Sequence, residues 1–138
     1  MKLDDDRIRA KLQDISRALM RLERFQEMSK GDFLSDEDSQ DIARSRLLTA
    51  IEAALNICYH INARMMKRVP EDYAECFRSL GEGHLIDRGL AARLSQMAQF
   101  RNRLVHLYWD IDYGQVYDII QHDIKDLKDF SNQVLRLL

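Results

Sequence analysis

Three residues that could act together on a phosphodiester, Arg101, Asn102 and His106, stand close together in the segment RNRLVHLYWDID, residues 101–112. Histidine titrates near neutral pH and can take or give a proton, whereas arginine stays charged and grips phosphate oxygens with a planar fork. RNA carries its own nucleophile, the 2′-hydroxyl, so its cleavage needs a base, an acid and positive charge at the phosphate. We therefore expect His106 as acid and base, Arg101 as phosphate clamp and Asn102 as support.

The spacing of these residues sets a condition on any shared site. Residues five apart on a regular helix point about 140° from each other, so Arg101 and His106 would lie on different faces. Bringing them to one phosphate requires a helix break near this point, side chains that wrap round from adjacent faces, or a second subunit that supplies one group. The sequence leaves all three arrangements open, and an arginine and a histidine at this spacing are by themselves a weak signal.

The residues around the segment add candidate RNA contacts, namely Arg103 and the aromatic rings of Trp109 and Tyr113. Arginine binds phosphate, and aromatic rings stack on bases. No group of aspartates or glutamates of the kind that two-metal nucleases use is evident, so we expect neither a metal site nor a cofactor. Structural or solvated roles are expected for the remaining histidines and tyrosines, which are His60, His84, His122, Tyr59, Tyr73 and Tyr117.

Helices must position these residues, because the chain has one proline and five glycines and carries no strand signal. Apolar residues at three-four spacing predict a first helix over residues 8–22, with Gly31 just beyond its end. Ser35 with the acids at 36–38 resembles a capping box, and a second helix should run from there to about Arg68.

The second half of the sequence predicts three further helices. Pro70 suits the first turn of a short one that glycines 81 and 83 would end. The next begins near Asp87, and a polar break over residues 109–114 separates it from a last helix that reaches Leu138. Apolar stripes on each helix predict an all-α fold, an antiparallel four-helix bundle with a short additional helix, as a single domain over residues 1–138.

The composition narrows the class of protein further. No apolar run approaches the eighteen or so residues of a membrane span, and the start MKLDDD is acidic, so we expect a cytoplasmic protein without membrane contact. Cys58 and Cys76 lack a CxxC pairing and are expected to be buried free thiols. The formal net charge of −2 argues mildly against nucleic-acid binding, although a run of arginines could form a local positive patch; these are Arg88, Arg93, Arg101 and Arg103.

The segment also resembles the signature of HEPN domains, in which arginine and a polar residue precede a histidine after four to six intervening positions. In the HepT branch a tyrosine follows two positions later, and Tyr108 matches it. The stretches AIEAALNICYHI (50–61) and YAECFRSLGEGHLIDRGLAARLSQMAQFRN (73–102) are similar to the HepT family too. The resemblance implies a HEPN-like bundle, a homodimer that joins two signatures in a cleft, and metal-independent endoribonuclease activity as a toxin.

The resemblance to HepT toxins also implies a partner. Their antitoxin is an MntA-type nucleotidyltransferase that silences the toxin by attaching AMP to the tyrosine of the signature, which corresponds to Tyr108. One alternative stays open: HEPN-like bundles also serve as non-catalytic helper subunits that bind a nucleotidyltransferase or a nucleotide, and the net charge of −2 suits that role as well.

Overall fold

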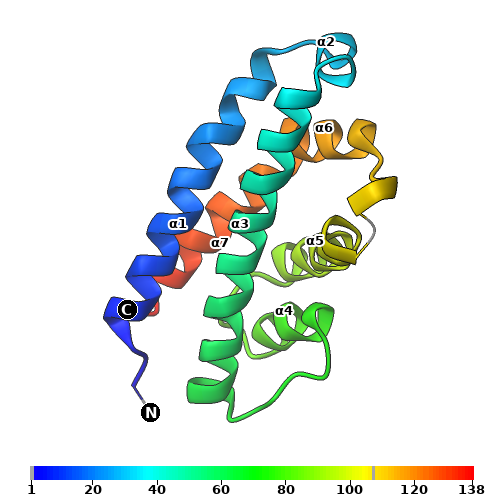
Figure 1. The fold of residues 1–138 in the computed structure, drawn as a ribbon. Helices are drawn as coiled ribbons and strands as arrows, with labels where there is room; N and C mark the ends of the chain where they lie inside the picture. The colour runs from blue at the N-terminus through cyan, green and yellow to red at the C-terminus, as the bar shows by residue number, and fades with distance from the viewer. Residues whose placement is uncertain (1, 107) are drawn as a thin grey trace.

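The computed structural model describes residues 2–106 and 108–138, and of Tyr108 it describes the backbone alone. In this part of the chain the regular elements are helices without strands, which confirms the predicted all-α fold. Figure 1 shows their arrangement. In chain order they are α1 (Asp5–Glu23), the 3-10 turn η1 (Arg24–Glu27), α2 (Lys30–Leu34), α3 (Glu37–Ile61), the π turn η2 (Asn62–Met66), α4 (Tyr73–Glu82), α5 (Arg88–His106), the 3-10 turn η3 (Tyr108–Asp110), α6 (Tyr113–His122) and α7 (Ile124–Leu135).

The long helices α1 and α3 run antiparallel, side by side, and α7 packs against both (Figure 1). Asp4 caps α1 by accepting from the Arg7 amide at 3.2 Å, and the predicted apolar stripe of α1 is buried against α3. Helices α4 and α5 form a second pair that packs on α3. The four principal helices of the predicted bundle are therefore α1, α3, α5 and α7, with α4 as the short addition.

The start of α3 differs from the sequence prediction by one residue. Asp36, and not Ser35, caps α3: its carboxylate accepts from the Asp38 amide at 3.2 Å and from the Ser39 hydroxyl at 2.7 Å. Ser35 instead closes the preceding helix α2, where its hydroxyl donates to the carbonyl of Gly31. A carboxylate accepts more strongly than a hydroxyl at a positive helix end, which explains the shift by one residue.

α4 ends at Glu82 with Gly83 as its C-cap, which confirms the predicted end, but the left-handed conformation is not on a glycine. The left-handed residue is His84, with φ 59°, and the amides of His84 and Leu85 donate to Gly81 and Leu80 in a Schellman arrangement. Gly81 lies inside the helix instead, where a Cβ would stand 2.7 Å from the Cβ of Ala91 on α5. The glycine therefore lets α4 and α5 approach closely.

The predicted last helix is divided in two. α6 ends at His122, Asp123 lies between the helices with φ −112°, and α7 leaves in a different direction (Figure 1). The division lets the apolar side of α6 face η1 and α2 while α7 packs on α1, α3 and α5. One straight helix could not reach both groups of partners.

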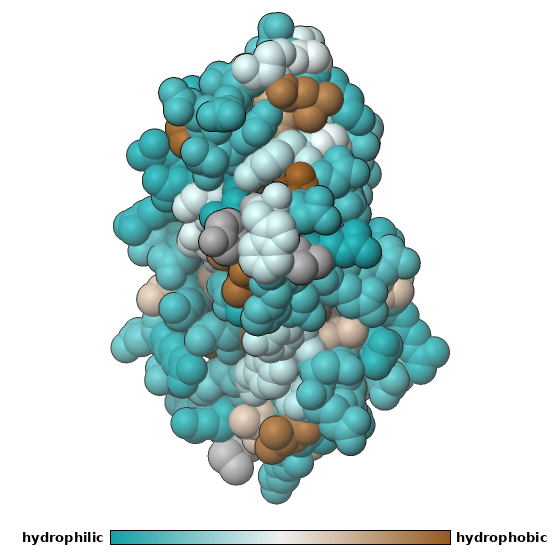
Figure 2. Space-filling model, turned by 45° about the vertical axis from the view of Figure 1, so that its right-hand side comes forward, coloured by the Kyte–Doolittle hydropathy of each residue, from teal (hydrophilic) through white to brown (hydrophobic). Residues whose placement is uncertain are grey.

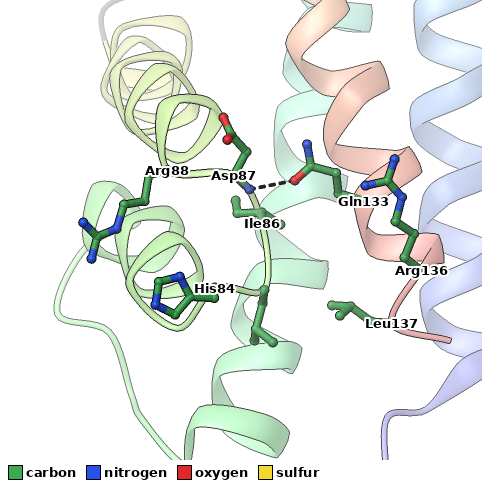
Figure 3. A pocket seen from close by; sticks show the side chains of 8 residues that line it. His84, Ile86, Asp87, Arg88, Gln133, Arg136 and Leu137 are labelled. Atoms are coloured by element: carbon green, nitrogen blue, oxygen red, sulfur yellow. Dashed lines mark hydrogen bonds between the residues drawn. The ribbon is translucent and has the colours of Figure 1, made fainter.

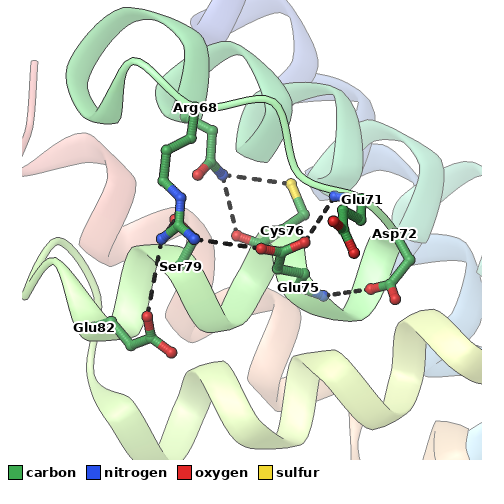
Figure 4. A network of polar contacts seen from close by, with 8 residues as sticks. Arg68, Glu71, Asp72, Glu75, Cys76, Ser79 and Glu82 are labelled. Carbon is green, nitrogen blue, oxygen red and sulfur yellow. Dashed lines mark hydrogen bonds and ion pairs between the residues drawn. The ribbon is translucent and has the colours of Figure 1, made fainter.

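A polar network joins the end of α3 to the start of α4 (Figure 4). The fully buried Asn62 donates to the carbonyls of Cys58 and Cys76 at 3.0 and 3.1 Å, and both cysteines are free and buried, which confirms that prediction. Asp72 caps α4 by accepting from the Glu75 amide at 2.7 Å, so α4 begins at the next residue and Pro70 stays outside it. This network fixes where the first side chain of α4 lies.

The buried apolar side chains form one connected core. Its largest fully buried members include the four phenylalanines Phe25, Phe33, Phe77 and Phe130, which come from elements in both halves of the chain. Within the described residues, none of the helices combines the length and the apolar character that crossing a bilayer requires.

Two glycine-to-alanine substitutions, one at the contact between α4 and α5 and one away from it, should change the stability of the fold in opposite directions. Gly81→Ala should lower the free energy of unfolding by about 1–3 kcal/mol, because the added methyl group meets Ala91. Gly31→Ala is the control: it places the same group in a helix with no atom within 4 Å and should stabilise by about 0.5–1 kcal/mol. Urea denaturation of both variants measures the difference, and equal effects would contradict the close approach.

Candidate active site

The segment singled out in the sequence lies where α5 ends. Arg101, Asn102 and His106 belong to the last two turns of α5, which is unbroken up to His106. The helix break considered from the sequence is therefore absent between the arginine and the histidine. On this continuous helix Arg101 and His106 point about 140° apart, so the helix by itself does not direct both side chains at the same point.

Arg101 is held by two other helices. Its Nε donates to the Glu52 carboxylate of α3 at 2.6 Å, and its guanidinium carbon lies 4.8 Å from the centre of the Tyr73 ring, at the start of α4. Only 14% of the Arg101 side chain is exposed. The pair and the ring together fix the guanidinium plane, since the ion pair sets its direction and the cation–π contact sets its tilt.

Asn102 and His106 occupy the exposed side of the same helix. Asn102 accepts from Nη1 of Arg101 at 3.3 Å through its side-chain oxygen, which couples it to the guanidinium. His106 is exposed at the C-terminal end of α5. His106 is thus placed to exchange protons with a ligand in solvent.

A second arginine secures the end of α5. Arg44 of α3 donates from Nη2 to the carbonyl of Leu104 at 3.0 Å, and its Nε is buried without a hydrogen-bond partner in the described part of the chain. The last carbonyls of a helix have no partner inside the helix, and a positive side chain there is favourable. Arg44 therefore supports the turn that carries His106.

The remaining predicted contacts lie around this helix end. Arg103 is exposed and donates to Gln115 at 3.5 Å, and Trp109 is 71% exposed on η3. Tyr113, the first residue of α6, is only half exposed; burial, and then the carboxylate of Asp41, raise its pKa. Trp109 therefore offers more ring surface for stacking than Tyr113 does. The side chain of Tyr108 lies outside the described part of the structure.

The face on which α5, η3 and α6 lie is turned toward the viewer in Figure 2. It is mainly hydrophilic, with small and separate hydrophobic patches. The described residues contain no group of three or more His, Cys, Asp and Glu side chains placed to hold a metal ion. A polar face of this kind suits a hydrated, charged ligand better than an apolar one.

Sequence reasoning missed Glu52, Tyr73 and Arg44 as parts of the site. Glu52 interrupts an apolar stretch of α3, and Tyr73 was expected to have a structural role, so the only signal was one acid in the stretch AIEAALN. His60, also expected to be structural, accepts the Asp4 amide at 3.0 Å, and burial lowers its pKa. It therefore acts as a neutral acceptor for the start of α1.

A cavity of about 730 Å³ lies at the opposite, N-terminal end of α5 (Figure 3). Arg88 and Arg136 line it on either side of the hydrogen bond from the Asp87 amide to Gln133, 2.7 Å long. Its charged side chains lie apart, whereas those at the other end of α5 are joined by direct contacts. The C-terminal end of α5 is therefore the better candidate for chemistry.

Several known proteins similar to this chain are ribonucleases. The profile of the family described as "Ribonuclease HepT-like" matches residues 15–134. The chain is 31% identical over 127 residues to the tRNA nuclease HepT of Aphanizomenon flos-aquae, covering 92% of this chain and 86% of that protein. It is 28% identical over 133 residues to the mRNA nuclease HepT of Shewanella oneidensis, covering 94% and 97%.

The fold is similar to a solved structure as well. The tri-AMPylated HEPN toxin of Shewanella oneidensis, in complex with MNT antitoxin, superposes with a TM-score of 0.87 at 26% identity, covering 99% of each chain. The likeness therefore extends over the whole helical arrangement and not only over the segment at the end of α5.

The geometry predicts that Glu52 stabilises the fold through Arg101. Glu52→Ala should lower the free energy of unfolding by about 1–2 kcal/mol, because it leaves a largely buried guanidinium without its acceptor; Glu52→Gln, which keeps an oxygen there, should cost less. In an Arg101→Ala background the same Glu52→Ala change should cost little. A double-mutant cycle by urea denaturation measures this coupling, and additive effects would show that the pair contributes nothing.

Proposed function

Because the chain belongs to the HepT-like ribonuclease family, we propose that it is a metal-independent endoribonuclease, the toxin of a toxin–antitoxin pair. The observation that carries the proposal is the fixed guanidinium of Arg101 on the same helix end as the exposed His106. Relatives named as nucleases of tRNA and of mRNA support RNA as the substrate class. The reaction would take place in the cytoplasm, where such RNAs are found.

In the proposed reaction His106 takes the proton of a 2′-hydroxyl, whose oxygen attacks the adjacent phosphorus. The bond from phosphorus to the 5′-oxygen breaks, a protonated imidazole supplies the proton that this oxygen needs, and the products are a 2′,3′-cyclic phosphate and a 5′-hydroxyl. Arg101 neutralises charge on the non-bridging oxygens through its Nη atoms, since Glu52 already occupies Nε. Asn102 helps to orient the guanidinium.

We infer that the complete site forms between two copies of the chain. Glu52 and Tyr73 hold Arg101 against α3 and α4, so its side chain is not free to wrap round α5 toward His106 of the same chain. A two-fold axis near the end of α5 would bring the partner's histidine to this arginine, so that each site joins the arginine of one chain and the histidine of the other. A homodimer is therefore the arrangement that the geometry favours.

We propose that an MntA-type nucleotidyltransferase controls the activity by transferring AMP to Tyr108. The similar solved structure of an AMPylated HEPN toxin with its MNT antitoxin supports this regulation. Tyr108 follows His106 by two residues, so a nucleotide there would add negative charge and bulk beside the helix end. Such a group would compete with the substrate phosphate for Arg101.

The catalytic assignment predicts that His106→Ala and Arg101→Lys each lower cleavage of total RNA in chelator by about 10²- to 10⁴-fold. Lysine keeps the charge of Arg101 and loses the fork, so this variant tests the geometry of the clamp. Arg88→Ala, which removes a cation at the far end of α5, is the control and should retain activity. Circular dichroism checks the fold of each variant, and the new ends should carry 2′,3′-cyclic phosphate.

The same assay tests assembly. Mixing inactive His106→Ala and Arg101→Lys proteins should restore about a quarter of wild-type activity, because half of the dimers would be mixed and each would have one intact site. No recovery after subunit exchange would mean that each site comes from one chain. A folded wild-type protein that cuts no RNA would favour the helper-subunit alternative.

The proposed regulation predicts that Tyr108→Phe cleaves RNA but escapes silencing, since phenylalanine has no hydroxyl to accept AMP. Intact-mass measurement after incubation with the nucleotidyltransferase and ATP should show the gain of AMP on the wild type and not on the variant. Two results would count against it, namely modification that persists on the variant or modified wild-type protein that cuts as fast as before.

A further inference from the structure

A second polar cavity lies beside the signature, between α5, α6 and α7. The division of the last helix at Asp123 leaves a space of about 230 Å³ there, smaller than the usual 300–1,000 Å³ of a site for a drug-sized ligand. Gln96 and Phe100 of α5 line one side, and Gln115 of α6 and Asp123 line the other. We call it the α5–α6–α7 pocket. Its size suits one planar ring system.

An ion pair forms one fixed wall of the α5–α6–α7 pocket. Arg93 donates from Nε to Asp126 at 3.0 Å, and the side chain of Asp126 is only 4% exposed whereas that of Arg93 is 53% exposed. The buried carboxylate thus holds a guanidinium whose plane stays accessible. Arginine planes and aromatic rings are the surfaces on which proteins stack unpaired bases.

Asp123 provides an acceptor in this pocket. It precedes α7 and makes no side-chain capping hydrogen bond with it, so the carboxylate is not used by the helix start. Burial, and then the neighbouring Asp126, raise its pKa, while His122, Lys125 and Arg93 act in the opposite direction. Arg93 and Asp126 compensate each other, which leaves a negative group that would repel phosphate and attract N–H donors.

The pocket lies on the side of α5 that leads to the candidate active site. Gln96, Phe100 and Arg103 are spaced by four and three residues, so they follow one face, and Arg103 contacts the pocket residue Gln115 at 3.5 Å. Phe100 is six residues from His106, about 9 Å along the helix axis. An RNA strand whose phosphate lay at Arg103 could therefore place a neighbouring base in the pocket.

We propose that the α5–α6–α7 pocket is a nucleobase subsite that selects guanine at a nucleotide beside the cleaved bond, and this rests on the proposed ribonuclease function. The Watson–Crick edge of guanine carries two adjacent N–H donors, which one carboxylate can accept together. Asp123 accepts them, the amides of Gln96 and Gln115 contact the remaining polar edge, and the plane of Arg93 stacks on the ring. The other three bases lack this pair of donors.

The test maps cleavage sites in a random-sequence RNA pool by sequencing the 5′-hydroxyl ends made in chelator. For the wild type, guanine should be enriched at one fixed position beside the cut by about 5- to 150-fold, the value of one well-matched bidentate pair. Asp123→Asn should reduce this enrichment to less than about threefold, because cleavage beside guanine falls while cleavage beside the other bases continues. Asp129→Asn, an equal loss of charge elsewhere on α7, should keep the enrichment.

A binding measurement separates the subsite from the chemistry. The inactive His106→Ala protein should bind a labelled RNA with guanine at that position at least fivefold more tightly than its adenine counterpart, and the Asp123→Asn change should remove the difference. If Asp123→Asn cleaves RNA with the wild-type base preference, or loses the same fraction of its cleavage activity on every sequence, the subsite proposal is overturned. The ribonuclease proposal would stand in either case. Loss of binding to the nucleotidyltransferase with unchanged base preference would assign the pocket to protein recognition and overturn it too. A wild type that cuts no RNA, together with guanine-selective binding by His106→Ala, would reject the ribonuclease proposal and keep the subsite.

Discussion

The ion pair between Arg101 and Glu52 is the contact on which the arrangement of the site depends. Arginine cannot lose its proton in a protein, so a guanidinium that is largely buried must have a compensating acceptor. Glu52 supplies it from α3, and the ring of Tyr73 covers the guanidinium from α4. Three helices are thereby positioned around one side chain, and the cap at Asp72, which sets the start of α4, becomes part of the support.

This support leaves the two proposed catalytic side chains, Arg101 and His106, with different conformational freedom. Arg101 is held on one side of α5, whereas His106 is exposed at the end of the same helix, where Arg44 donates to the carbonyl of Leu104. A rigid phosphate clamp loses little conformational entropy when a substrate binds, and an exposed imidazole exchanges protons readily. Since a continuous helix keeps the two groups apart, the proposed dimer would make catalysis depend on assembly.

The division of the last helix at Asp123 affects both the packing of the core and the shape of the surface. It allows α6 to pack on α2 and η1 while α7 packs on the long helices, and it opens the α5–α6–α7 pocket next to Arg103. The same change of direction thus contributes to the core and creates the surface that we assign to base selection. The exposed Trp109 lies on η3, which connects α5 and α6, two of the helices that line this pocket.

The sequence by itself determined the all-α fold, most helix boundaries and the segment that carries Arg101 and His106, because these depend on periodicity and residue type over a few neighbouring positions. Only the tertiary structure decided the partners of that segment. Glu52 is 49 residues from Arg101, and Arg44 is 60 residues from Leu104, so nothing local relates them. The break at Asp123 was decided in the same way, since α6 packs on α2 and η1 while α7 packs on α1, α3 and α5.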